Sequence, residues 1–154
     1  MRAFVISICL LFITACALLP STPLPPISAN LGAEFTLTPG QIVTINDTDL
    51  KIILIGVPSD GRCPLDIECA ESGPVSATIS IQSGSEAPQE VSFLTFTDND
   101  GSIPQMDFEG MTTSVEQNGY LVQIISITPF PQKRIGEIHA EEYRARLAVT
   151  KINN

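Results

Sequence analysis

The sequence predicts an all-β protein with a single folded domain. An antiparallel β-sandwich is the expected architecture, with a small β-barrel as the alternative. Apolar and polar residues alternate with period two over seven or eight short segments, which is typical of strands that bury one face. Turn residues separate these segments. No segment shows a sustained helical stripe, and only 16% of the residues are charged.

The first half of the domain contains five predicted strands, at residues 34–38, 41–45, 50–57, 75–82 and 91–97. Pro39-Gly40 turns the chain after the first strand, and polar turn residues at 46–49 separate the second from the third. Residues 52–55 are all aliphatic. Their strand is therefore expected to be central in its sheet and covered on both faces.

The second half contains three further predicted strands, at residues 111–116, 120–128 and 143–152, of which the first has the weakest pattern. Asn118-Gly119 predicts a two-residue type I′ hairpin, because both central positions of that turn need positive φ. Pro129 and Pro131 are expected to end the strand that precedes them. At most one helical turn is expected, at residues 138–142.

The first sixteen residues have the layout of a bacterial export signal. Arg2 supplies a positive charge, an uncharged and mostly apolar run follows, and small residues precede Cys16. Residues 13–16 resemble the lipobox of bacterial lipoproteins. The resemblance implies that residues 1–15 are a signal peptide that is removed, and that Cys16 is then acylated at the new N-terminus. An anchor of two or more acyl chains holds a protein stably at a membrane.

Two other interpretations of this segment stay open. Ala15-Cys16-Ala17 also satisfies the small-x-small rule for ordinary signal cleavage, which would release a soluble secreted protein. Alternatively, the uncharged stretch from Ala3 to Leu19 reaches the lower limit of a spanning helix, roughly 17–25 residues. The short apolar run that ends in a cysteine favours the lipoprotein.

Residues 16–32 are predicted to form the acylated cysteine and a proline-rich tether, with the sandwich domain at 33–154. Four prolines fall between residues 20 and 26, at Pro20, Pro23, Pro25 and Pro26. Such a density favours an extended, polyproline-like spacer over a packed element.

The charge balance excludes some classes of partner. The chain has 8 basic and 17 acidic residues and a formal net charge of −9. Binding to nucleic acid or to an anionic lipid surface needs basic patches. No nucleic-acid partner is therefore expected, and contact with a membrane is expected only through the lipid anchor.

The cysteines agree with export. Cys9 leaves with the signal peptide and Cys16 takes the lipid, so only Cys63 and Cys69 are left to pair. A close pair of cysteines in an oxidising compartment predicts one disulfide. A zinc site would need four ligands, whereas these two cysteines are accompanied by a single histidine, His139. No metal or other cofactor is expected.

The segment from Arg62 to Cys69 is the most distinctive part of the domain. Its Arg-Cys-Pro…Cys sequence, followed by Gly73, resembles the signature of a family of uncharacterised bacterial secreted and lipid-anchored β-domains. The resemblance extends loosely from residue 41 to 152. This chain departs from the family pattern at Glu71 and Ser72, where the family has a tryptophan and an alanine just before the glycine. The family has no assigned activity, so the resemblance implies a fold and a location only.

This segment is also the candidate binding surface. Asp66, Glu68 and Glu71 could be displayed around Arg62, with Phe130 contributing an exposed apolar patch. The alternative, which the pattern favours, is a disulfide-closed connection between two strands whose charges are simply solvated.

Two other groups of residues suggest chemistry. Asp98-Asn99-Asp100-Gly101, with Asp107 and Glu109 beyond, could bind calcium, but Phe96 stands where an EF-hand loop needs a ligand, so a polar turn is favoured. His139, beside Glu137, Glu141 and Glu142, could be part of an acid–base pair. A nucleophile with an orienting third group is not evident, and no Gly-x-Ser-x-Gly motif occurs.

We therefore expect a lipid-anchored extracytoplasmic protein without enzymatic activity. It would be a binding or structural module of the cell envelope whose partner is another envelope protein or a glycan. A small extracytoplasmic hydrolase is one alternative and predicts a concave pocket with His139 or paired carboxylates. A secreted domain that inhibits a protease is the other and predicts protruding, ordered turns.

Overall fold

The computed structural model describes residues 23–106, 108–133 and 138–152. One sheet contains β1 (Ile27–Ala29), β3 (Ile42–Ile45), β4 (Leu50–Asp60), β5 (Val75–Ser83) and β6 (Gln89–Thr95), in that order across the sheet. The other contains β2 (Glu34–Leu37), β9 (Arg144–Lys151), β8 (Tyr120–Thr128) and β7 (Ser114–Gln117), also in that order. A single helical turn, η1 (Ala140–Glu142), precedes β9.

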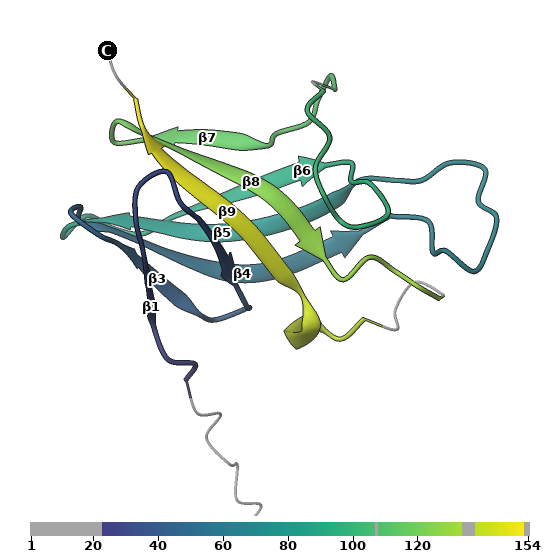
Figure 1. The fold of residues 1–154 in the computed structure, drawn as a ribbon, viewed down its shortest axis with the longest axis horizontal. Helices are drawn as coiled ribbons and strands as arrows, with labels where there is room; N and C mark the ends of the chain where they lie inside the picture. The colour runs from purple at the N-terminus through teal and green to yellow at the C-terminus, as the bar shows by residue number, and fades with distance from the viewer. Residues whose placement is uncertain (1–22, 107, 134–137, 153–154) are drawn as a thin grey trace, which may run out of the picture.

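The two sheets pack face to face (Figure 1). Apart from the parallel pair β1–β3, every pair of neighbouring strands in them is antiparallel. The predicted antiparallel sandwich is therefore confirmed. The alternative of a barrel is wrong, because the strands form two separate sheets.

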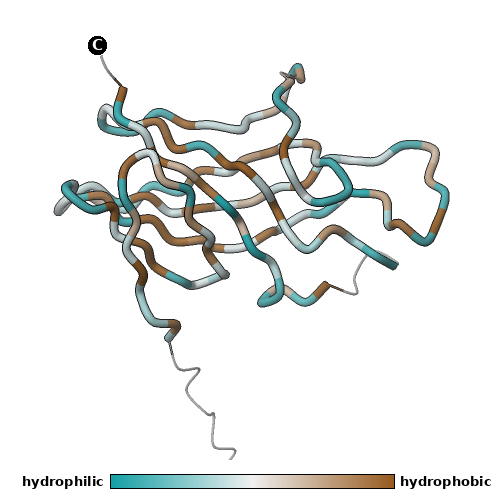
Figure 2. The backbone as a smooth tube through the Cα atoms, viewed as in Figure 1, coloured by the Kyte–Doolittle hydropathy of each residue, from teal (hydrophilic) through white to brown (hydrophobic). Residues whose placement is uncertain are grey.

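Inward-facing apolar residues, which alternate with outward-facing ones along the strands, build the core between the sheets. In β5 the inward positions Val75, Ala77 and Ile79 are fully buried, and in β9 Leu147 and Val149 are fully buried. Apolar residues follow the strands of both sheets through the middle of the molecule (Figure 2). Each large aliphatic side chain removed from water in this way contributes roughly 1.5–3 kcal/mol to folding.

The prediction for residues 52–55 is half right. β4 is the middle strand of its sheet. However, only Ile52 and Leu54 are fully buried, whereas Ile53 is partly exposed and Ile55 is 49% exposed. A two-layer sandwich covers one face of each sheet, and the other face of β4 meets water.

The predicted tether is too long at its C-terminal end. Ile27–Ala29 forms β1, which pairs in parallel with β3, and Ala29 is buried. Gln41 Nε2 also donates to the Pro25 carbonyl at 3.2 Å. The domain therefore begins before residue 33. A three-residue strand directly after the prolines is too short for its alternation to be recognised from the sequence. Residues 1–22, with the predicted signal peptide and Cys16, lie outside the described residues.

Most of the other predicted elements are confirmed with small shifts. Asn118 and Gly119 have φ values of 50° and 80°, as the predicted type I′ hairpin between β7 and β8 requires. β8 ends at Thr128, directly before Pro129. β6 begins and ends two residues earlier than predicted, and β9 begins one residue later.

The connection between β6 and β7 joins the edges of both sheets. Leu94 of β6 exchanges two backbone hydrogen bonds with Thr112, at 3.0 and 2.8 Å. Ser102 forms a bridge with Ser126 of β8. The long connection at residues 96–113 thus runs along one side of the sandwich and is fastened to each layer.

Candidate functional site

Arg62 lies at the base of the connection between β4 and β5, and it is fully buried. Its Nε donates to Asp60 Oδ1 at 2.8 Å, and its Nη2 forms an ion pair with Asp60 Oδ2. The same guanidinium donates to the backbone carbonyls of Ile127 at 2.8 Å and Pro129 at 2.9 Å. A buried charge is tolerated only when it is paired and hydrogen-bonded, as this one is.

Two aromatic residues complete this cluster. The Phe130 ring lies with its centroid 5.1 Å from Arg62 Cζ, and the Tyr143 hydroxyl donates to Asp60 Oδ2 at 3.0 Å. Burial, followed by the neighbouring Asp60 carboxylate, raises the pKa of Tyr143 from 10.0 to about 12. The cluster ties the end of β4 to the end of β8 and the start of β9.

The prediction is therefore wrong for two residues of the binding surface. Arg62 is fully buried and Phe130 is 6% exposed, so neither belongs to a surface. The sequence gives no direct sign of this, because an arginine is seldom buried without a partner. Asp60, two positions before Arg62, is that partner, and the Asp-x-Arg spacing is the signal that could have suggested it.

The connection leaves the sandwich through a narrow neck. Gly61 donates to the Pro74 carbonyl at 2.9 Å, and Gly73 donates to the Gly61 carbonyl at 2.8 Å. A Cβ atom on Gly61 or on Gly73 would lie 2.9 or 2.8 Å from the carbonyl oxygen opposite, so close approach of the two backbones requires glycine at both positions.

Beyond the neck, the predicted disulfide closes the loop. The Cys63 and Cys69 sulfur atoms are 2.12 Å apart, and the two Cα atoms are 6.0 Å apart. The Leu65 amide donates to the Pro131 carbonyl at 3.1 Å, and Ser72 Oγ accepts from the Cys63 amide at 3.1 Å. We call residues 62–72 the disulfide loop.

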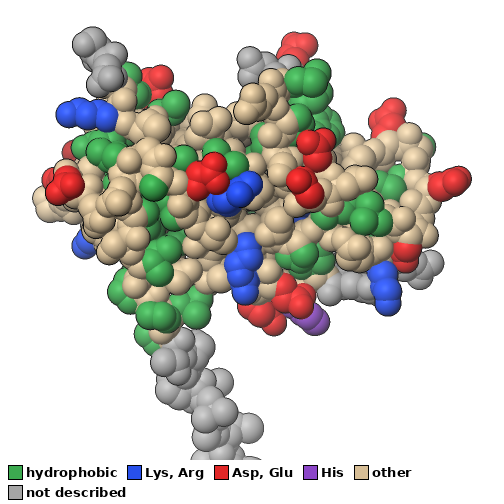
Figure 3. All heavy atoms as spheres, in the orientation of Figure 1, with side chains coloured by type: hydrophobic (Ala, Val, Ile, Leu, Met, Phe, Trp, Pro, Cys, Tyr) green, Lys and Arg blue, Asp and Glu red, His purple; other side chains and the backbone are tan. Residues whose placement is uncertain are grey.

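The tip of the disulfide loop is both apolar and acidic. Leu65 is 50% exposed and Ile67 is 45% exposed. The predicted surface residues Asp66, Glu68 and Glu71 are all exposed around them. In Figure 3, acidic side chains stand out at the end of the molecule that carries this loop. Of the predicted surface residues, the three acidic ones are therefore exposed, and two aliphatic residues that were not predicted, Leu65 and Ile67, are exposed with them.

The other candidates for chemistry are distributed over the surface. Asp100 Oδ1 accepts from the Ser102 amide at 2.8 Å, and the Gly101 amide donates to the Asp98 carbonyl at 2.8 Å, which makes this segment a hydrogen-bonded turn. Asp107 lies outside the described residues. Within the described ranges, no three His, Cys, Asp or Glu side chains are grouped so that they could hold a metal ion.

His139 is exposed at the start of η1. Its backbone amide donates to Glu142 Oε2 at 2.7 Å, so Glu142 serves to cap the helical turn. Glu137, which the sequence placed beside it, lies outside the described residues.

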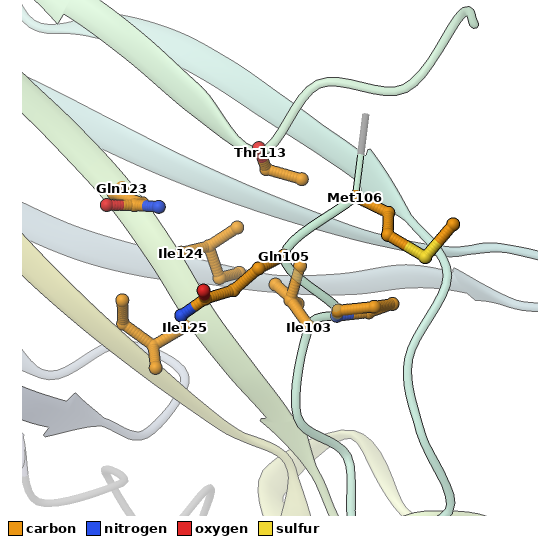
Figure 4. Close-up of a pocket in the computed structure, with 8 residues that line it drawn as sticks. Ile103, Gln105, Met106, Thr113, Gln123, Ile124 and Ile125 are labelled. Atoms are coloured by element: carbon orange, nitrogen blue, oxygen red, sulfur yellow. The ribbon is translucent and has the colours of Figure 1, made fainter. Parts of the chain in front are cut away.

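The outer face of the four-stranded sheet carries two shallow pockets. The first, of about 360 Å³, lies between β8 and the 96–113 connection, and Figure 4 shows Ile103, Met106 and Ile125 around it. Among the described residues, this pocket is lined by no His, Asp or Glu. The second, of about 320 Å³, has Arg146 and Asp100 in its wall together with serine and threonine side chains. Sequence reasoning missed both pockets, because the residues that line each one lie far apart in the sequence.

Comparisons with protein-family models, with curated proteins and with solved structures found no match to this chain. The described part of the chain contains no helix with the length and apolar character needed to cross a membrane. The disulfide is compatible with an extracytoplasmic location.

Proposed function

We propose that the protein is a lipid-anchored binding module of the cell envelope, and that its disulfide loop contacts a partner protein. One observation carries this proposal: a loop fastened at its base by a buried ion pair, a disulfide and a glycine neck exposes Leu65 and Ile67 at its tip. Ordering the loop before binding lowers the entropy lost on association.

The charges of the loop indicate the chemistry of the partner surface. Asp66, Glu68 and Glu71 are exposed, whereas the basic residue of the loop, Arg62, is buried and paired with Asp60. A complementary surface would have an apolar depression for the two aliphatic side chains and a basic rim.

The lipid anchor is the second part of the proposal. Cys16 is its acceptor, and the segment between it and β1 would be the tether, about 30 Å long if residues 17–26 are extended. Figure 1 places the disulfide loop at the end of the sandwich away from β1, where the described chain enters the domain. An anchor at the N-terminus would thus leave the loop accessible.

Site-specific photocrosslinking in the producing cells tests the loop. A photoreactive residue at position 65 should give a discrete adduct, and the same residue at position 55, also exposed but on the outer face of β4, should not. The adduct should depend on Ile67 and on the acidic residues around it. Equal adducts from both positions would contradict the proposal.

Mass spectrometry tests the anchor separately. The mature protein should begin at residue 16 and carry acyl chains, and Cys16→Ser should be neither acylated nor retained in membranes. A mature chain that begins elsewhere would rule out the anchor without affecting the loop.

Inhibition of a protease is a second candidate function, since the disulfide loop is a protruding, ordered turn. A panel of serine and cysteine proteases should then include one that the wild type inhibits and that Leu65→Ser inhibits much less. Cleavage of the loop by every protease that binds it would count against this function.

A further inference from the structure

The outer face of the four-stranded sheet contains a row of polar residues that strand register brings together. Arg146 of β9 pairs with Thr36 of β2 on one side and with Ser126 of β8 on the other. Ser126 in turn bridges Ser102 of the 96–113 connection. The four residues form one line across the sheet, and cross-strand partners point to the same face.

A β-bulge in β8 lies on this line. The register of β8 against β9 shifts between Ile124 and Ser126. The extra residue, Ile125, is partly exposed and lines the apolar pocket, whereas Ser126 lines the polar one. Bulges commonly redirect side chains in this way beside binding sites. The two pockets therefore adjoin along β8.

The polar pocket is lined by hydroxyl groups around one guanidinium. Its residues are Thr36, Asp100, Ser102, Ser126, Thr128 and Arg146. Arg146 uses little of its hydrogen-bonding capacity: Nη1 lies 3.4 Å from Glu34 Oε2, and the buried Nε has no hydrogen-bond partner among the described residues. An arginine has five N–H donors in a planar fork.

The carboxylates around Arg146 decide which ligands fit. Ser102 donates its backbone amide to Asp100 and thereby lowers the pKa of Asp100, so this carboxylate is ionised at neutral pH. Glu34 supplies a second negative charge beside the guanidinium. Figure 3 shows basic and acidic side chains next to one another on this face. A free anion would meet two carboxylates for one guanidinium, whereas a neutral ligand would not be repelled.

We propose that this pocket binds a neutral sugar of a glycan. Adjacent hydroxyls of a sugar both donate and accept: Arg146 would donate to their oxygens, Asp100 would accept from them, and the serine and threonine hydroxyls would do either. The adjoining apolar pocket, with Ile103, Met106 and Ile125, would cover the C–H face of a second sugar. This site is separate from the disulfide loop and does not rest on the function proposed for it.

The test measures binding of the intact domain to a microarray of neutral and acidic oligosaccharides, followed by titration of neutral disaccharides (maltose, cellobiose and chitobiose) by saturation-transfer NMR. The wild type should bind at least one neutral oligosaccharide. Arg146→Met should weaken that binding at least tenfold, and Arg146→Lys, which keeps the charge without the fork, at least fivefold. Thr36→Val, which removes one hydroxyl and keeps the shape, should weaken it by a smaller factor.

Lys151→Met is the matched control, since it also removes one positive charge from β9, whereas Lys151 is exposed at the end of that strand and pairs with Tyr120 rather than with a pocket residue. It should bind as the wild type does. Thermal unfolding of each variant separates loss of the site from loss of the fold. The proposal is overturned if no neutral oligosaccharide binds, if folded Arg146→Met binds as well as the wild type, or if inorganic phosphate or acidic glycans alone bind.

Discussion

Two long connections are fastened to the same sandwich by different means. The disulfide loop at residues 62–72 is held at its base by the buried Arg62–Asp60 pair and closed by a covalent bond, and its tip extends beyond the sheets. The connection at 96–113 has backbone hydrogen bonds to both β6 and β8 and runs along the edges of the sheets. The first arrangement exposes side chains to a partner, whereas the second closes one side of the core.

The largest effect is expected from removing the buried charge that supports the disulfide loop. Arg62→Ala leaves Asp60 without its cation in a mostly buried position and should lower the free energy of unfolding by roughly 3–5 kcal/mol. Urea denaturation measures this. Arg144→Ala, at a partly exposed arginine, is the control and should change it by less than about 1 kcal/mol. A loss below about 1 kcal/mol in Arg62→Ala would show that the pair does not hold the loop.

The next largest effect tests the 96–113 connection. Gly101 has φ +83°, and a Cβ there would lie against the Ile127 carbonyl oxygen, so Gly101→Ala should lower the free energy of unfolding by roughly 2–4 kcal/mol. Gly110 has nearly the same φ, +79°, with nothing within 4 Å of a Cβ.

Gly110→Ala should therefore lower the free energy of unfolding only by the cost of holding a residue with a Cβ at positive φ, roughly 1–2 kcal/mol. Equal losses in the two variants, measured by the same denaturation, would mean that contact with β8 adds nothing at Gly101.

Loss of the covalent closure should have a somewhat smaller effect than loss of the buried pair. Replacing Cys63 and Cys69 together by serine removes a constraint worth roughly 2–2.5 kcal/mol by the chain-entropy estimate. Because Arg62 still anchors the base, the fold should persist, and the tip should become more accessible to proteases. An unchanged rate of proteolysis in the double variant would show that the buried pair alone orders the loop.

The smallest expected effect is a pH dependence of the free energy of unfolding, which arises from Tyr143 at the base of the disulfide loop. Burial and the Asp60 carboxylate raise the pKa of Tyr143 to about 12, so folding favours the protonated phenol. Its contribution is fully present below pH 10, the pKa of an unperturbed tyrosine, and is lost as the pH rises towards 12. The loss should be about 1 kcal/mol, since partial solvation screens the interaction.

Tyr143→Phe should remove this part of the pH dependence. Denaturation of both proteins between pH 9 and 12 gives the difference. Parallel curves for the wild type and the variant would indicate that the hydroxyl does not interact with Asp60 in solution.

Much of the fold can be predicted from local patterns in the sequence. The alternation in β5 and the Asn118-Gly119 hairpin are correct because side-chain period and turn conformation depend on neighbouring residues. The disulfide was predictable by counting cysteines. The candidate site was harder to predict, because Leu65 and Ile67 resemble core residues in the sequence. Only their exposure in the structure shows that they belong to a surface.

The sequence by itself determined that this chain forms strands, where most of them begin and end, and that Cys63 pairs with Cys69. The tertiary structure alone decided that Arg62 and Phe130 lie inside, that the segment after the prolines joins a sheet, and that Thr36, Arg146 and Ser126 meet on one face. The physical reason is range: periodicity and turns act over a few residues, whereas burial and strand register depend on which distant segments pack together.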